Sequence, residues 1–252
     1  MLAIYLKELR SYFINAIGYV YIGIFLAISA LLFCYTTLIS NTYSTANYFS
    51  MLILVLVVLI PLLTMKLFAE EKKLRTEQML LTAPVSITGM VLGKYFAAFT
   101  MYAGSVILSC INFLPLYATA AMERSEAGQQ ASHIHIGPSD AQILGSLVGI
   151  LFIGAVFIAV GMFISTLTEN QLAAAVITIA SLIGMLAPAS INNPAIISSY
   201  AVRFVIDWFN ILSRFANFSA GKFDFAAIFY YISLCSVFVF ATVRVYDKRR
   251  WG

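Results

Sequence analysis

The sequence predicts an all-α integral membrane protein with six transmembrane helices, and two observations support this. Hydrophobic residues make up 62% of the 252 residues and charged residues only 10%, whereas a soluble domain carries about 25% charged residues. Six apolar stretches are also long enough to cross a bilayer, which takes about 20 residues of helix. None alternates between polar and apolar residues as the strands of a membrane β-barrel do. Helices are therefore the structure that satisfies the backbone hydrogen bonds within lipid.

The six predicted spans are expected to form a single transmembrane domain over residues 1–252. Their approximate limits are 17–40, 48–68, 90–118, 141–164, 171–191 and 225–246. Pro61 and Pro115 are expected to bend the second and third spans. In the fourth span, small residues recur at spacings that favour close helix packing, namely Gly145, Gly149, Gly154 and Gly161.

The basic residues predict the orientation, because Lys and Arg are enriched on the cytoplasmic side of membrane proteins. An even number of spans puts both termini on one side. Eleven of the 15 Lys and Arg residues lie on that side: Lys7, Arg10, Lys66, Lys72, Lys73, Arg75, Lys94, Arg244, Lys248, Arg249 and Arg250. Both termini and the 69–90 loop are therefore predicted to be cytoplasmic. The net charge of +4 follows from this distribution, so nucleic acid is not an expected partner.

The first sixteen residues, MLAIYLKELRSYFINA, predict an amphipathic helix before the first span. Such a helix lies in the membrane interface, with its basic groups toward lipid headgroups. The alternative is that these residues only extend the first span. The apolar residues at helical spacing are Leu2, Tyr5, Leu6, Leu9, Phe13 and Ala16, while the rest of the wheel carries Lys7, Glu8, Ser11 and Asn15.

Two segments are predicted to face the outside. Residues 192–224 begin with Asn-Asn-Pro, which is a helix-start pattern, and we expect one or two short re-entrant or interfacial helices here, between spans five and six. Residues 119–140 form a polar loop, in which His133 and His135 have no third ligand at metal-binding spacing and are expected to be solvated. The apolar residues of the first segment suit a membrane–water boundary and recur at Ile197, Tyr200, Phe204, Trp208, Ile211 and Phe215.

The sequence offers no catalytic site. Its acids and bases lie in loops or near span ends, whereas proton relays and ion-coupled carriers need ionisable groups inside the membrane. It also has no nucleophile with a matching base. Cys34, Cys110 and Cys235 are isolated within predicted spans, where thiols pack as small apolar groups. We therefore expect a protein that is not an enzyme and that holds no metal or cofactor of its own.

The most charged segment is EEKKLRTEQMLL, residues 70–81. Its residues favour a helix throughout, and a proline soon after stops it. Opposite charges four residues apart, Glu71 with Arg75 and Lys73 with Glu77, can pair along one face. Three apolar residues close the segment. Two interpretations are open: a solvated turn, or a helix that docks a soluble partner.

These residues resemble a family. The cytoplasmic loop of ABC type-2 transporter permeases is similar to FAEEKKLRTEQMLLTAPVSITGMVLGK, with a charged helix before Leu-Leu-x-x-Pro and a Gly-Lys that opens the third span. The gliding-motility-type subgroup has Gly-Thr and then a Glu two residues after the Thr. In this chain Arg75 stands in place of the Gly before Thr76, and Gln78 stands in place of the Glu, with Glu77 one position earlier. Otherwise the subgroup resembles nearly the whole chain, through KELRSYFINAIGYVYIGIFL, IGAVFIAVGMFISTLTENQLAAAV, NFSAGKFDF and RVYDKRRWG.

The resemblance implies the permease subunit of an ATP-driven exporter in a bacterial cytoplasmic (inner) membrane. The chain would pair with a second permease copy or a homologue. A cytoplasmic ATP-binding cassette subunit would bind the ATP and Mg²⁺, and an extracytoplasmic accessory subunit is left open. The ATPase would contact a coupling helix between spans two and three, together with the amino-terminal helix: Glu70, Glu71, Lys72, Lys73, Arg75, Thr76, Glu77, Met79, Leu80 and Leu81, with Lys7, Glu8 and Arg10.

The turn at residues 165–171 would be a second contact with the ATPase. Two other functions stay open. The chain could be a channel or carrier that works without ATP, or a membrane anchor that recruits soluble machinery.

Overall fold

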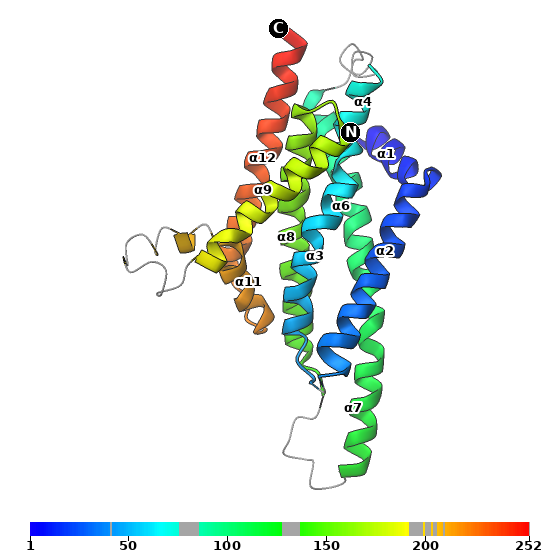
Figure 1. Cartoon of the computed structure of the whole chain (residues 1–252), viewed down its shortest axis with the longest axis vertical. Coiled ribbons are helices and arrows are strands. Elements are labelled where there is room, and N and C mark those ends of the chain that lie inside the picture. The colour runs from blue at the N-terminus through cyan, green and yellow to red at the C-terminus, as the bar shows by residue number, and fades with distance from the viewer. Residues whose placement is uncertain are drawn as a thin grey trace.

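The computed structural model describes residues 1–40, 42–75, 86–127, 137–191, 199, 203, 206–208 and 210–251. Every regular element among these residues is a helix (Figure 1). In chain order the elements are α1 (Leu2–Ile14), α2 (Ala16–Phe33), the π-helix η1 (Cys34–Leu38), α3 (Ala46–Thr64), α4 (Lys66–Lys73), α6 (Ile87–Ser109), the 3₁₀-helix η2 (Cys110–Phe113), α7 (Leu114–Ala127), α8 (Asp140–Leu167), α9 (Gln171–Ile191), α11 (Ile211–Ser219) and α12 (Phe225–Trp251).

Six helical stretches in this described part are long and apolar enough to cross a membrane, which is the predicted number in the predicted order. The third is longer than predicted, because η2 and α7 continue α6 beyond Pro115. The second continues through α4. Their limits are Ala16–Leu38, Ala46–Lys73, Ile87–Glu123, Asp140–Leu167, Gln171–Ile191 and Phe225–Arg250.

The helices α3 and α8 form the centre of the bundle, since most of their residues are buried, whereas most residues of α2, α9 and α12 are not. The glycines of α8 explain how closely its neighbours approach. A Cβ at Gly154 would overlap the Tyr102 ring of α6, and one at Gly161 would overlap the Thr64 side chain of α3. The prediction that small residues mark close packing in this span is confirmed.

The amino-terminal helix α1 is separate from the first span. It ends at Ile14, and Asn15 has extended backbone with φ −82° and ψ 144°, so the chain changes direction before α2 begins (Figure 1). The alternative that these residues only extend the first span is wrong. Figure 1 also shows both chain ends and α4 at one end of the bundle, while α7 reaches the opposite end.

Between the fifth and sixth spans lies the short helix α11. Asn210 caps it by accepting hydrogen bonds from the backbone N–H groups of Leu212 and Ser213, both at 3.1 Å, as an N-cap residue does. Phe215 and Phe218 are buried and pack against α8, where Gly149 leaves room for the Phe215 ring. The predicted apolar positions Ile197, Tyr200 and Phe204 lie outside the described residues, as do His133 and His135.

Candidate functional site

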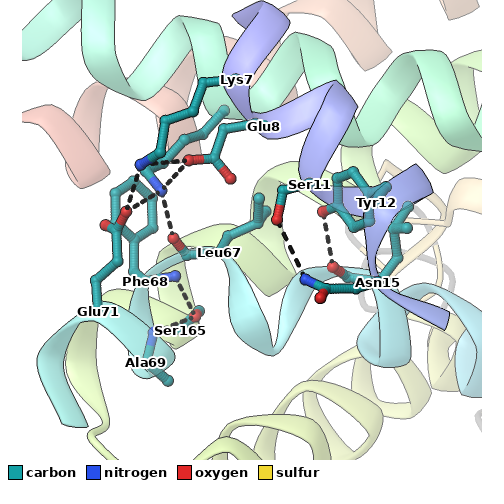
Figure 2. A network of polar contacts seen from close by, with 12 residues as sticks. Lys7, Glu8, Ser11, Tyr12, Asn15, Leu67, Phe68, Ala69, Glu71 and Ser165 are labelled. Carbon is teal, nitrogen blue, oxygen red and sulfur yellow. Dashed lines mark hydrogen bonds and ion pairs between the residues drawn. The ribbon is translucent and has the colours of Figure 1, made fainter. Parts of the chain in front are cut away.

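The main polar feature at the end that holds both termini is a buried lysine. Lys94 lies in α6 and is only 1% exposed. Its ammonium nitrogen donates hydrogen bonds to Glu8 Oε1 of α1 at 3.0 Å, to Glu71 Oε1 of α4 at 2.8 Å and to the Leu67 carbonyl at 2.9 Å. Figure 2 shows Glu8 of α1 and Glu71 and Leu67 of α4 turned toward one another. A lysine ammonium has three donors, so all of them are used.

This arrangement compensates the charge of Lys94. Removing an ammonium from water costs several kcal/mol, and two carboxylates offset that cost. The ring of Phe68 adds to this, with its centroid 5.1 Å from Lys94 Nζ. Lys7, which is exposed, adds a second cation 3.6 Å from Glu8 Oε1 and 3.8 Å from Glu71 Oε1. The ion cluster, defined as Lys7, Glu8, Glu71 and Lys94, is therefore neutral as a whole.

Small residues bring α1 onto α6. A Cβ at Gly93 would lie 3.2 Å from the Met1 carbonyl and 3.3 Å from Ile4 Cβ, which is tight contact. The missing side chain at position 93 thus lets α1 lie directly on α6, next to Lys94. Glu8, one turn of helix beyond Ile4, then reaches the ammonium group.

Two tyrosines fix α1 further. Tyr12 is buried, and its hydroxyl donates to the Leu63 carbonyl at the end of α3, at 3.1 Å. Burial, and after it the charge of Glu8, raises the pKa of Tyr12, so the phenol stays protonated and remains a donor. Tyr5 shares a hydrogen bond of 3.1 Å with Thr100 of α6.

A serine from α8 holds the joint between α3 and α4. The helix is interrupted at Met65, so the first backbone N–H groups of α4 lack partners within the helix. Ser165 Oγ accepts hydrogen bonds from the N–H groups of Phe68 at 3.2 Å and Ala69 at 3.1 Å, and donates to the Met65 carbonyl at 3.2 Å (Figure 2). Ser165 thus does for α4 what an N-cap residue normally does from within its own chain segment.

The carboxyl end of α12 closes this corner. The ring of Tyr246 packs on Phe68, with 4.9 Å between the ring centroids. Arg249 donates from its guanidinium to the Thr166 carbonyl at 2.7 Å. Thus α4 is in contact with α8 and α12 on one side and, through the ion cluster, with α1 and α6 on the other.

The structure separates the predicted contact residues into inward and outward groups. Glu8 and Glu71 face Lys94, and Glu70 is partly exposed beside Lys66, at 3.9 Å. Thr76, Glu77, Met79, Leu80 and Leu81 lie outside the described residues. Of the remaining predicted contacts, Lys72 is half-buried, and those that are exposed are Lys7, Arg10, Lys73 and Arg75.

The prediction of a continuous helix from residue 70 to 81 is wrong at its centre. The helix α4 ends at Lys73, and Arg75 has a φ of +57°, so Glu71 and Arg75 are not one helical turn apart. A surface pair at that spacing contributes only about 0.3–0.5 kcal/mol. The loss of Glu71 from the buried Lys94 would cost more, about 3–5 kcal/mol, because it leaves a buried charge poorly compensated.

The other predicted contact, the turn at residues 165–171, is also divided. Ser165 and Thr166 are fully buried, while Leu167, Glu169 and Asn170 are exposed. Only the later residues of this turn could meet a partner.

Sequence reasoning missed the role of Lys94 and counted it only among the basic residues of one side. A signal was present, because Lys94 lies inside the predicted span 90–118 and an ionisable residue within a span calls for a partner. The sequence alone could not show that the partners are Glu8 and Glu71, which are distant along the chain.

The space beside the ion cluster is small and polar. A cavity of about 50 Å³ is lined by side chains of α1, α4, the start of α2 and Asn15 between α1 and α2, which is room for very few water molecules. Within the described residues, no three His, Cys, Asp or Glu side chains are grouped so that they could hold a metal ion. The geometry here joins helices and does not form a substrate pocket. The lining residues are Glu8, Ser11, Tyr12, Asn15, Ile17, Lys66, Leu67 and Glu70.

The fold and this corner define a class. Six helices long and apolar enough to cross a bilayer indicate a multi-pass membrane protein, with a charged helix joint at one end of the bundle. Comparisons of the chain with protein-family models, with curated proteins and with solved structures find no match.

Proposed function

We propose that this chain is the membrane-spanning permease subunit of a type-2 ATP-binding cassette exporter. It would form the translocation path with a second permease copy or a homologue. A separate cytoplasmic subunit would bind and hydrolyse the ATP. The observation that supports this most is the end of α4, where the second span continues past the joint at Met65 and ends in an exposed basic turn, Lys73–Arg75.

The orientation in the membrane follows from the same residues. The end of the bundle that carries α4 and both termini also carries most of the basic side chains. Since such an end faces the cytoplasm, the exposed turn would be accessible to a soluble ATPase. The membrane would be the bacterial inner membrane, by the resemblance of the sequence.

The ion cluster refines the kind of partner surface to expect. Because Glu8 and Glu71 are turned inward to Lys94, the exposed groups around the joint are mostly cations. A soluble subunit that docks here would therefore present carboxylates, since complementary charge guides association. The exposed cations at this end are Lys7, Arg10, Lys73, Arg75, Lys248 and Arg250.

The test is reversal of charge at this turn. The variant Lys72→Glu/Lys73→Glu/Arg75→Glu is expected to insert into the membrane normally and to lose association with the ATP-binding cassette subunit, so that ATP hydrolysis no longer drives transport. A matched control is Lys222→Glu, an exposed cation between α11 and α12, which should leave association unchanged. Normal association and coupling in the triple variant would contradict the proposal.

Reconstitution of this chain alone separates the other functions. Steady flux through vesicles without ATP would indicate a channel or carrier. A membrane anchor would still bind its soluble partner, but polar substitutions on the inward faces of the spans would leave its activity intact.

A further inference from the structure

We propose that Lys94 is a positioning residue that makes α1 and α4 move together, with the joint at Met65 and Ser165 as the pivot. This inference deepens the proposed function, because the exposed turn after α4 is where a soluble partner would act. It rests on that function only for the identity of the partner. The coupling between the two helices is a property of this chain alone and is testable without any partner.

One nitrogen, Lys94 Nζ, binds both helices. Glu8 belongs to α1 and Glu71 to α4, and both accept from Lys94 Nζ. With the Leu67 carbonyl also bound, the ammonium group has no donor left. Bulk water does not reach the ammonium group to replace a lost carboxylate, since Lys94 is only 1% exposed. A displacement of Glu71 must therefore either carry Lys94 and Glu8 with it or leave a buried charge poorly compensated.

At its start, α4 is joined to α3 through Met65. Pro61 has no N–H to donate within α3, and the helix is interrupted at Met65. The Ser165 hydroxyl bridges the interruption by contacting Met65, Phe68 and Ala69. The first turn of α4 is also held by the bond of the Leu67 carbonyl to Lys94 and by the contact of Phe68 with Tyr246. Because Ser165 accepts from the N–H groups of Phe68 and Ala69, a tilt of α4 at this point need not pass into α3 through a continuous ladder of backbone hydrogen bonds.

Besides the ion cluster, in which Lys7 also lies 3.8 Å from Glu71 Oε1, two tyrosine contacts hold α1 to helices other than α4. Tyr12 bonds to the Leu63 carbonyl of α3, and Tyr5 bonds to Thr100 of α6. These contacts hold α1 to the bundle but carry no displacement of α4. They provide a control. Removing one of them should make α1 more mobile, but α1 should still move whenever α4 moves.

The experiment measures the two helices against the bundle centre. Spin labels are placed at exposed positions in pairs, Leu6→Cys of α1 with Leu144→Cys of α8, and Leu74→Cys with Leu144→Cys. Leu144 lies near the start of α8 and Ser165 near its end, and α8 rises about 1.5 Å per residue, which suits distances measured by pulsed electron paramagnetic resonance. The native cysteines Cys34, Cys110 and Cys235 are replaced by Ser, and the full chain is studied in lipid nanodiscs.

The perturbation is Ser165→Ala, which removes the acceptor at the pivot. With the ion cluster intact, we expect this change to broaden the Leu74–Leu144 and Leu6–Leu144 distance distributions together. In the background Glu8→Gln/Lys94→Met/Glu71→Gln, which leaves no stranded charge, Ser165→Ala should broaden only the Leu74 pair. The control background Tyr5→Phe should behave like the native chain.

Three results would overturn the proposal. In the first, Ser165→Ala leaves the Leu74 distribution unchanged, so that there is no pivot. In the second, the Leu6 distribution does not respond although the cluster is intact. In the third, it responds equally without the cluster. If the triple background fails to fold, Lys7→Ala/Glu8→Ala replaces it, since Lys94 then keeps Glu71 and the Leu67 carbonyl while α1 loses its contacts with both Lys94 and Glu71.

Because no ATPase is present, a failure of this test leaves the proposed function standing. Likewise, if the charge-reversal test contradicts the proposed function, the distances expected here stay the same. The two ideas are therefore judged separately.

Discussion

Glu8 of α1 and Glu71 of α4 accept hydrogen bonds from the same nitrogen, Lys94 Nζ, at 3.0 and 2.8 Å. The two carboxylates are thus held close together by a cation between them. Without that cation only the exposed Lys7 would offset the repulsion between these two mostly buried carboxylates. The stability of this corner therefore depends on a balance of charge more than on any single contact.

The first prediction concerns this balance. Lys94→Met leaves two negative charges facing each other and is expected to lower the free energy of unfolding by about 3–5 kcal/mol. Glu8→Gln/Lys94→Met/Glu71→Gln removes all three charges and should recover most of that loss. Thermal unfolding in detergent compares the two variants. Equal stability of the single and triple variants would show that charge balance does not matter here.

The second prediction concerns the joint before α4. Ser165→Ala removes the acceptor for the N–H groups of Phe68 and Ala69, and should cost about 1 kcal/mol, as the loss of an N-cap does. Ser146→Ala is the matched control on the same helix, because the Ser146 hydroxyl is buried without a partner among the described residues. Its removal should be neutral or stabilising. The same loss at both positions would mean that the cap contributes nothing.

The third prediction concerns the contact between α6 and α8. A Cβ at Gly154 would overlap the Tyr102 ring, and that ring cannot turn away, since it is buried and its hydroxyl donates to the Ile150 carbonyl at 2.6 Å. Gly154→Ala should therefore destabilise the protein by about 1–3 kcal/mol. Gly104→Ala on α6, where nothing lies within 4 Å, should be neutral or slightly stabilising. Thermal unfolding measures both changes.

The fourth prediction concerns pH and lies outside the spans. The Asn217 amide donates to Asp224 Oδ2 at 2.9 Å, and the backbone N–H groups of Ala226 and Ala227 donate to Oδ1. These hydrogen bonds, that of Asn217 first, lower the pKa of Asp224. Because the pKa of Asp224 is lower in the folded protein than in the unfolded chain, the ionised carboxylate stabilises the fold at pH values above its pKa in the unfolded chain. This contribution is lost as the pH falls through its pKa in the folded protein.

Asp224→Asn should therefore reduce stability at neutral pH and approach the native chain at low pH. The unfolding temperature of both proteins, followed from pH 7 down to about 3, checks this. A constant difference over the whole range would exclude a contribution from the ionised carboxylate.

The sequence predicted the features that depend on local pattern. Long apolar runs predicted the six helices, because each run has to satisfy its backbone within itself in lipid. The close packing of Gly154 and Gly161 followed from small residues at helical spacing. The break at Asn15 could be foreseen only as one of two alternatives, since no proline or glycine marks it.

The site depended on contacts that no local pattern specifies. Glu71 was predicted to pair with a neighbour on the same helix, yet it pairs with Lys94 on another. Exposed pairs within a helix contribute only tenths of a kcal/mol, so a buried partner elsewhere decides the outcome. Ser165 is a similar case, because nothing near it in the sequence shows that it caps α4.

The position of the ion cluster in the chain bears on how the protein is made. Lys7, Glu8, Glu71 and Lys94 are all synthesised before α8 leaves the ribosome. The nascent chain therefore contains every group needed to neutralise the buried lysine before its central helix is made. Helix α8, which supplies Ser165 to the start of α4, is synthesised only after these four residues.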